Sequence, residues 1–183
     1  MAKSNGRTDE ELVEASNRGD PRAFETLYHR HKEWATRLAY RFTGNEDDAM
    51  DVVQDAFLYF LKKFPGFRLT AQLTTFLYPV VKNISLSRIR RDSRCEPDEE
   101  IVTSAADAPA QESLGHYELA AAVSCLSELH REVLLMRFVD DMKVQDIARA
   151  LGVPLGTVKS RLHNALKTLR EDERTRALFG EES

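Results

Sequence analysis

Hydrophobic residues recur at steps of three and four along most of the first half of the chain, which is the period of a helix with one buried face. This pattern predicts four helices, beginning near residues 9, 21, 46 and 73. The residues expected to face the core are Phe24, Leu27, Tyr28, His31, Trp34, Leu38 and Phe42 in the second helix, Met50, Val53, Ala56, Phe57, Phe60 and Phe64 in the third, and Leu73, Phe76, Leu77, Val80, Ile84 and Ile89 in the fourth.

Polar residues and turn residues mark where these helices begin and end. Thr8 opens a sequence with capping-box spacing, and the first helix is expected to run to about residue 18. Asp20 and Pro21 suit the N-cap and the first position of the second helix. Asn45 is expected to cap the third helix, which then breaks into a loop at residues 64–73.

The composition changes abruptly after the fourth helix. Residues 92–112 are rich in acidic and small residues and have no apolar period, which is typical of a flexible linker. We therefore expect two helical domains, at residues 1–94 and 113–183, joined by an acidic linker at residues 95–112.

The second domain also has a helical period. No stretch alternates at period two, so the predicted fold class is all-α, with two small helical domains. The residues expected in its first two apolar stripes are Leu119, Ala122, Val123, Leu126, Leu129, Val133, Leu134, Met136 and Phe138.

Residues 144–164 have the pattern of a helix-turn-helix. Ala148 is small where two helices would cross, Gly152 supplies the turn, and Pro154 cannot continue the first helix. The residues expected in its core are Ile147, Leu151, Val153, Val158, Leu162, Ala165 and Leu166.

The polar face of the second helix of this motif has the chemistry of a DNA reader. Residues 155–170 include lysine and arginine but no acidic residue, so nothing on this helix would repel phosphates. The side chains expected to reach DNA are Thr157, Lys159, Ser160, Arg161, His163 and Asn164.

Composition narrows the class of protein. The 183 residues are 42% hydrophobic and 31% charged, as in a globular protein, and no apolar run approaches the roughly 20 residues of a membrane helix. Residues 1–6 lack the apolar core of a secretion signal, so we expect a cytoplasmic protein without membrane insertion. The net charge of −4 argues against nonspecific coating of nucleic acid.

Little in the sequence points to catalysis. Cys95 and Cys125 are far apart and suit neither a zinc site nor a disulfide, and Cys125 is expected to be an inert core thiol. The histidines are scattered, no carboxylate pair shares a site, and there is no phosphate loop. We expect no enzymatic activity, no metal and no cofactor.

Four blocks of the sequence, in order, resemble the sigma-70 superfamily of RNA polymerase sigma factors, specifically its extracytoplasmic-function (ECF) group. Residues 24–28 (FETLY) resemble the start of the sigma-two domain, and residues 46–57 resemble its polymerase-binding helix. Residues 75–91 are similar to the segment that recognises the promoter −10 element. Residues 126–138, followed by the helix-turn-helix, resemble the sigma-four domain.

The resemblance implies a role for each block in promoter-specific initiation. Asp51, Gln54 and Asp55 would dock on basic helices of the largest polymerase subunit, and the linker would run through the polymerase channels. The loop at 64–73 would hold a base flipped from the −10 element, and the helix-turn-helix would read the −35 element. The residues implied in −10 recognition are Phe64, Phe67, Arg68, Asn83, Arg88 and Arg91.

Three positions depart from the family pattern. Phe76 replaces a tryptophan, which keeps the aromatic packing but loses the indole donor. Pro79 replaces a basic residue and predicts that the −10 helix begins late or kinks there. Lys143 stands where a polar N-cap is usual, and Asp141 is expected to cap in its place.

The implied partners are core RNA polymerase, promoter DNA and an anti-sigma protein. The alternative is a stand-alone helix-turn-helix regulator, in which the acidic helix and the −10-like block would have no purpose.

Overall fold

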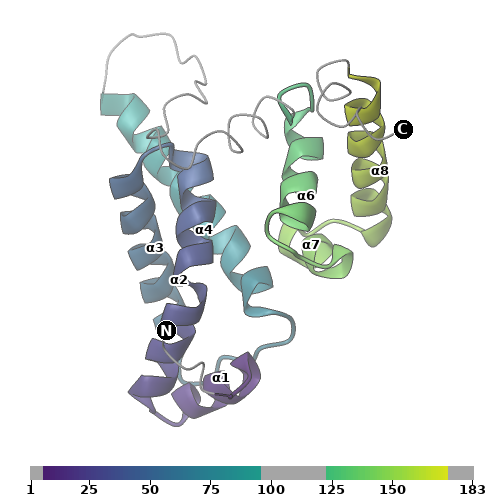
Figure 1. The fold of residues 1–183 in the computed structure, drawn as a ribbon. Coiled ribbons are helices and arrows are strands. Elements are labelled where there is room, and N and C mark those ends of the chain that lie inside the picture. Colours follow the sequence, from purple (N-terminus) through teal and green to yellow (C-terminus); the bar gives the residue numbers. More distant parts are fainter. Residues whose placement is uncertain (1–5, 96–122, 173–183) are drawn as a thin grey trace. The chain divides into compact units, whose positions relative to one another are not determined.

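The computed structural model describes residues 6–95 and 123–172, which form helices and the turns between them. The chain divides into two compact units, Met1–Val102 and Thr103–Ser183. The described residues form four helices in unit 1 and three in unit 2 (Figure 1): α1 (Asp9–Asn17), α2 (Pro21–Thr43), α3 (Glu46–Leu61), α4 (Leu73–Cys95), α6 (Glu128–Phe138), α7 (Val144–Leu151) and α8 (Leu155–Glu171). The described residues contain no strand, which confirms the all-α prediction.

The predicted helix ends in unit 1 are confirmed. Thr8 forms the expected capping box with Glu11, since each side chain accepts a hydrogen bond from the other residue's backbone N–H. Asp20 caps α2 through the backbone N–H of Arg22. Asn45 caps α3 in the same way. These signals are local, because each cap lies two or three residues from the backbone N–H that it binds.

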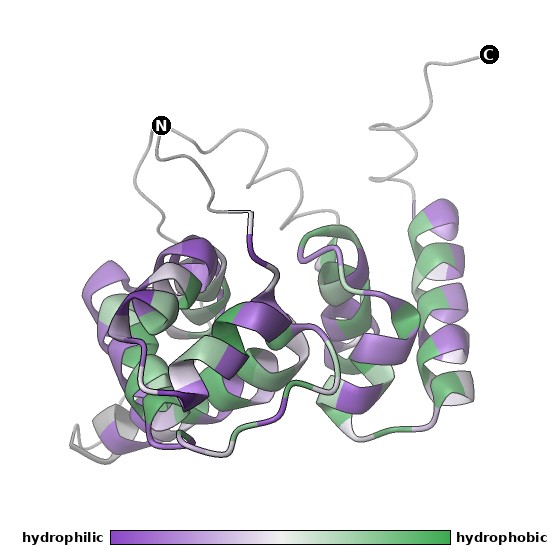
Figure 2. Ribbon diagram, turned by 90° about the horizontal axis from the view of Figure 1, so that it is seen from below, coloured by the Kyte–Doolittle hydropathy of each residue, from purple (hydrophilic) through white to green (hydrophobic). Residues whose placement is uncertain are grey.

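Helix α2 is the centre of unit 1, because α1, α3 and α4 each contact it. Helices in both units show hydrophobic and hydrophilic residues alternating along their length, as expected where one face is buried (Figure 2). The buried core of unit 1 consists of Leu12, Val13, Ala15, Ala23, Leu27, Ala35, Leu38, Ala39, Ala49, Val52, Val53, Ala56, Phe57, Phe60, Leu73, Leu77, Tyr78 and Val81.

Of the residues predicted in this core, two are exposed, and the others are buried or half-buried. Met50 is 43% exposed, whereas its neighbour Ala49 and also Val52 are buried on α3. Ile89 is 36% exposed. On α4 the buried face continues through Ser85 toward Arg88, which pairs with acidic residues of α3, so Ile89 is turned away from the core.

Pro79 does not delay α4. The helix begins at Leu73 and contains Pro79 in its second turn, so the prediction of a late start is wrong. Because proline has no N–H, the carbonyl of Thr75 loses the helical hydrogen bond that residue 79 would otherwise donate. The hydroxyl of Thr75 is itself buried without a hydrogen-bond partner, so polar groups of this turn are incompletely satisfied.

Unit 2 packs α6 and α7 against α8. One apolar cluster joins Val123, Leu126 and Leu134 to Ala165 of α8, with Leu166 and Leu169 against it. Among the described residues of the unit, the other apolar side chains with no exposure are Val133, Met136, Met142, Ile147 and Val158. Two predicted core residues are exposed: Leu129 by 52% and Phe138 by 62%. They lie near opposite ends of α6.

The helix-turn-helix has the predicted turn but not the predicted cap. Gly152 ends α7 in the left-handed conformation, with φ of 65°. Asp141 does not cap α7, because it reverses the chain at φ of 49° and its side chain accepts a hydrogen bond from Arg137. The acid in the first turn of α7 is Asp146, which is buried and favoured by the positive end of the helix.

Three further expectations concern the linker, Cys125 and membrane insertion. The linker expected at residues 95–112 lies, apart from Cys95, outside the described residues, as do Leu119 and Ala122. Cys125 is exposed in the turn before α6, so the interpretation as a core thiol is wrong. None of the described helices is long and apolar enough to span a membrane.

Candidate functional site

Helix α3 presents a polar row opposite its buried face. Asp51, Gln54 and Asp55 are all exposed, as expected for a docking surface. The side chains of Gln54 and Asp55 make no hydrogen bond or ion pair within the described residues, so they are available to a partner. Exposed apolar side chains border the row, including Leu58 at 53% exposure, and the surface therefore offers both charge and apolar contact area.

Asp51 is tied to helix α4 through Arg88. The Arg88 Nε donates to Asp48 Oδ1 over 2.6 Å, and its Nη2 donates to Asp51 Oδ2 over 2.8 Å. Partial burial acts to lower the pKa of Arg88, but the hydrogen bonds and charges of the two carboxylates outweigh it and raise that pKa. The structure thus joins two residues that the sequence assigned to different partners.

The other −10 candidates on α4 differ from Arg88 in their exposure. Asn83 and Arg91 are both exposed, whereas Arg88 is half-buried, and Arg91 follows Arg88 by three residues and so lies beside it on the helix. Neither side chain makes a hydrogen bond or ion pair within the described part of the chain. Both side chains are therefore available to a nucleic-acid strand, whereas Arg88 is already engaged with Asp48 and Asp51.

The loop between α3 and α4 is held by its aromatic rings. Phe64 lies 5.2 Å from Phe60 and 5.9 Å from Phe24 between ring centroids. Phe67 lies 5.1 Å from Phe60 and 4.8 Å from Phe76, the residue that replaces the family tryptophan. Both loop phenylalanines are therefore half-buried anchors, and Arg68 beside them is exposed.

A residue that sequence reasoning missed holds the backbone of the same loop. The Gly66 N–H donates to Asn17 Oδ1 over 2.7 Å, and Asn17 Nδ2 donates to the Phe67 carbonyl over 2.8 Å. Asn17 is the last residue of α1, and the loop passes beside that helix in Figure 1. Its partners are about fifty residues away in sequence, and no local pattern indicates such a pairing.

A cavity of about 440 Å³ opens beside this loop. It is lined by Asp9, Glu10, Arg30, His31, Leu69, Gln72, Leu73 and Thr74. One wall is charged: Asp9 Oδ2 lies 2.8 Å from His31 Nε2, and Asp9 also pairs with Arg30. Burial acts to raise the pKa of Asp9, but the bonds and charges of His31 and Arg30 hold it below its ordinary value.

Helix α8 carries the predicted −35 residues on its outer face. Lys159, Ser160, His163 and Asn164 are exposed, while Thr157 and Arg161 are partly buried. The Ser160 hydroxyl donates to the carbonyl of Thr157 in its own helix. Within the described residues, the side chains of Lys159, Arg161, His163 and Asn164 make no hydrogen bond or ion pair. The helix thus offers donors to a groove while Val158 and Ala165 hold it to the unit.

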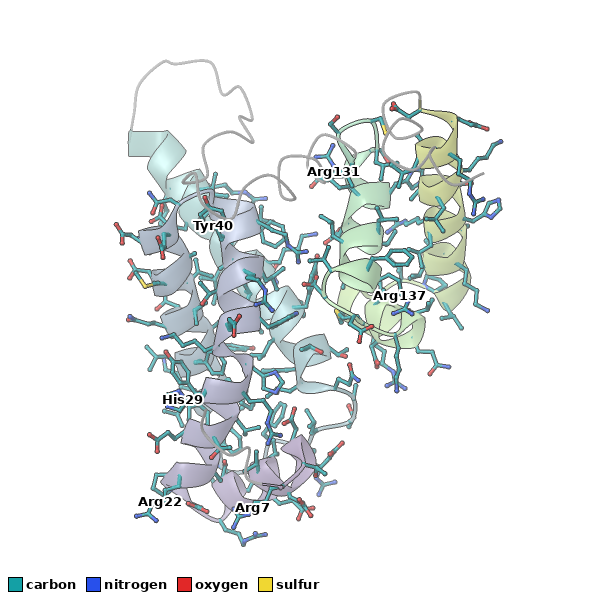
Figure 3. The ribbon with its side chains drawn as sticks, in the orientation of Figure 1. Arg7, Arg22, His29, Tyr40, Arg131 and Arg137 are labelled. Atoms are coloured by element: carbon teal, nitrogen blue, oxygen red, sulfur yellow. The ribbon has the colours of Figure 1, made fainter. Side chains whose placement is uncertain are left out.

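Two arginines of α6 support this helix-turn-helix (Figure 3). Arg131 donates to the carbonyls of Val123, Ser124 and Leu126 and so fixes the turn before α6. Arg137 donates to Asp141 and to the carbonyl of Met142, which fixes the turn before α7. Both arginines are thereby engaged in holding the shape of unit 2. No described group of three or more His, Cys, Asp or Glu residues is arranged to hold a metal ion.

Comparison with known solved structures supports the fold. CnrH, solved in complex with the cytosolic domain of CnrY, matches with a TM-score of 0.67 and 24% identity over 96% of this chain and 99% of that chain. The sigma factor RpoE from Bartonella quintana, solved with the anti-sigma factor NepR, matches with a TM-score of 0.62 and 26% identity over 81% of this chain and 94% of that chain.

Comparison with known sequences gives the family. Residues 27–95 match the model of sigma-70 region 2, and residues 116–169 match that of sigma-70 region 4. The ECF RNA polymerase sigma factor SigM of Mycobacterium tuberculosis is 37% identical over 87% of this chain and 81% of its own length. SigW of Bacillus subtilis is 26% identical over 88% and 95%. The chain belongs to the sigma-70 family and, within it, to the ECF RNA polymerase sigma factors, which act in transcription initiation.

Proposed function

We propose that this sigma factor divides its work between the two units. Unit 1 docks on core RNA polymerase and recognises the −10 element, and unit 2 recognises the −35 element. The domain limits that go with this division are residues 1–94 and 113–183, joined by the acidic linker at 95–112. The chain supplies promoter choice and helps to open the duplex, while the polymerase performs nucleotide transfer, so we assign no active site to this protein.

The single observation that carries the docking assignment is the exposed row of Asp51, Gln54 and Asp55. A free carboxylate on a rigid helix suits a basic surface, because charge complementarity steers the encounter and fixes its register. Asp55 is the sharpest test residue, since it is exposed and has no partner within the described residues. Asp51 is a poorer choice because its loss would also release Arg88.

The DNA assignments follow from the free donors and from the cavity. Asn83 and Arg91 on α4, with Arg68 in the loop, would contact the −10 strand. The cavity beside the loop has a polar wall and a volume of about 440 Å³, which suits a flipped base. Phe64 and Phe67 would anchor the loop that supplies part of the pocket's lining, and Arg88 would act through its pairing with α3. Lys159, Arg161 and their neighbours would read the −35 element in the major groove.

An anti-sigma protein is the regulatory partner that we propose, in the cytoplasm. A structural relative, RpoE of Bartonella quintana, was solved with the anti-sigma factor NepR. The exposed side chains of Leu58 in unit 1 and of Phe138 in unit 2 are apolar anchors of the kind that such a partner would cover. A stand-alone regulator is the weaker candidate, because it would leave the acidic row of α3 without a role.

The test of docking is capture of core RNA polymerase by the full chain. Asp55→Arg is expected to abolish capture, because it places a guanidinium against a basic surface. The matched control is Glu14→Arg, the same charge reversal at an exposed position of α1 in the same unit. Equal capture by the wild type and Asp55→Arg would overturn the docking assignment. Equal loss in both variants would show that net charge, rather than this row, controls binding.

A further inference from the structure

We propose that Asn17 is a positioning residue for −10 recognition: its side-chain amide fixes the backbone of the loop between α3 and α4, and with it the pocket beside that loop. The inference rests on the proposed role of the loop in reading the −10 element. Asn17 lies on α1, outside every block of sequence that we assigned to DNA or polymerase.

The oxygen and the nitrogen of the Asn17 side-chain amide each form a hydrogen bond with one of two consecutive loop residues. It accepts from the Gly66 N–H over 2.7 Å and donates to the Phe67 carbonyl over 2.8 Å. This bidentate arrangement fixes the direction of the intervening backbone as well as its distance, since both bonds must be satisfied together. Among the described residues, no other side chain hydrogen-bonds to the backbone of residues 65–71.

The backbone that Asn17 holds is unusual at Gly66. Its φ of 109° lies in a region that side-chain-bearing residues rarely adopt. Glycine permits this conformation but does not select it, because glycine also has many others available. The two hydrogen bonds from Asn17 supply the selection, while the rings of Phe64 and Phe67 anchor the loop from the other side.

Helix α1 is a firm support for this contact. Its side chains Leu12 and Val13 are almost completely buried. Its first residue, Asp9, pairs with both Arg30 and His31 of α2. A positioning side chain needs such support, because it can be no more precise than the element that carries it.

The held segment leads directly into the pocket. Leu69 and Gln72 of the loop form part of its lining, and Asp9 and Glu10 of α1 form another part. Asn17 does not line the cavity, but its hydrogen bonds tie together the helix and the loop that supply these two parts of the lining. Without its hydrogen bonds, the loop wall would lose its fixed relation to the α1 wall, and a base in the pocket would be discriminated less well.

The experiment measures base discrimination by the holoenzyme formed from core RNA polymerase and the full chain. A promoter is first selected with the wild type from a library randomised at the −10 and −35 elements. Transcription is then compared between that promoter and single-base variants, which gives one discrimination ratio for each element. These ratios do not depend on the amount of active protein, so a loss of stability alone leaves them unchanged.

Asn17→Ala is expected to lower the −10 ratio by about fivefold or more and to leave the −35 ratio unchanged, since it removes two hydrogen bonds at one element only. The −10 ratio of Asn17→Asp is expected to lie between those of the wild type and Asn17→Ala. Its carboxylate still accepts a hydrogen bond from the Gly66 N–H but cannot donate one to the Phe67 carbonyl. The control is Ser16→Ala, which removes a hydroxyl that donates only within α1, to the Leu12 carbonyl. This variant should keep both ratios.

Two results would overturn the inference: an unchanged −10 ratio in Asn17→Ala, or an equal fall in both ratios. Failure of the proposed function would look different. In that case the wild-type chain would direct initiation from no member of the library, and no ratio could be formed for any variant.

Discussion

In unit 1, half of the side chains that we assign to the −10 element already contact other parts of the unit. Phe64 and Phe67 pack in an aromatic cluster, and Arg88 bridges Asp48 and Asp51. In unit 2, by contrast, the six side chains that we assign to the −35 element make no hydrogen bond or ion pair with another element that the structure describes. The two surfaces are prepared for DNA in different ways.

The difference matches two kinds of recognition. An outward face of a helix can read a closed duplex with free donors, because the groove itself presents the bases. A base taken out of the stack needs a pocket whose walls are fixed in advance. We therefore expect the −10 residues to be sensitive to changes in stability, and the −35 residues to be sensitive to changes in charge.

The largest expected change in the free energy of unfolding comes from a substitution at the centre of the aromatic cluster. Phe60→Ala should lower the free energy of unfolding of unit 1 by about 3–5 kcal/mol, because Phe60 is fully buried against Phe64 and Phe67. Urea unfolding followed by the fluorescence of Trp34 measures this, since the single tryptophan of the chain lies in α2. Leu58→Ala on the same helix is exposed and should cost far less.

The next effect is at the backbone of the loop. Gly66→Ala should cost about 1–3 kcal/mol, because the φ of 109° strains any residue with a Cβ. No atom lies within 4 Å of the added Cβ, so the cost comes from the backbone and not from a clash. The control is Gly156→Ala in α8, where φ is ordinary and alanine favours the helix. Circular dichroism melting compares them, and equal effects would contradict the strain argument.

Arg88 and Arg91 test the difference between an arginine that stabilises the unit and one that contacts DNA. Arg88→Ala should destabilise unit 1 by about 1 kcal/mol, because it leaves Asp48 and Asp51 unpaired at a partly exposed site. Arg91→Ala removes the same charge from the same helix where it has no ion pair within the described residues, and should leave stability unchanged. Trp34 fluorescence reports both variants. A larger loss of stability in Arg91→Ala would reverse the two assignments.

The acid sensitivity of helix α1 should be smaller still. The folded pKa of Asp9 is depressed below 3.8, so its stabilising pairing is fully present above that value and is lost as the pH falls through the folded pKa. The stability difference between the wild type and Asp9→Asn should therefore shrink below about pH 4. Urea unfolding between neutral and acidic pH measures it. A constant difference across this range would show that His31 and Arg30 do not depress the Asp9 pKa.

Sequence reasoning succeeded for most local signals, although the cap at Asp141 and the late start of α4 at Pro79 were wrong. The caps at Thr8, Asp20 and Asn45 and the turn at Gly152 depend on residues a few positions away, and the structure confirms all four. The apolar period placed the buried faces only approximately: Met50 was expected inside, but it is exposed and its neighbour Ala49 is buried.

Sequence reasoning failed where two distant segments must meet. The bridge between Arg88 and Asp48 joins residues 40 positions apart, and the amide of Asn17 meets a loop 49 positions away. Neither pairing leaves a periodic or capping signal. The individual −10 candidates could therefore be proposed from the sequence, but which of them are braces and which are free could not.

The smallest expected effect on stability is on α8, where it tests directly whether the two DNA-binding surfaces differ. Lys159→Ala should change the free energy of unfolding by less than about 0.5 kcal/mol, because the side chain is exposed and unpaired within the described residues. It should nevertheless weaken promoter binding by the holoenzyme and reduce the slope of log affinity against log salt by about one. Lys167→Ala is the control on the same helix, since Lys167 lies 3.8 Å from Glu171 and its charge is partly neutralised there. Lys159→Ala could instead destabilise the protein and leave the slope of log affinity against log salt unchanged. In that case Lys159 stabilises unit 2 as Arg88 stabilises unit 1, and the proposed contrast between the two surfaces does not hold.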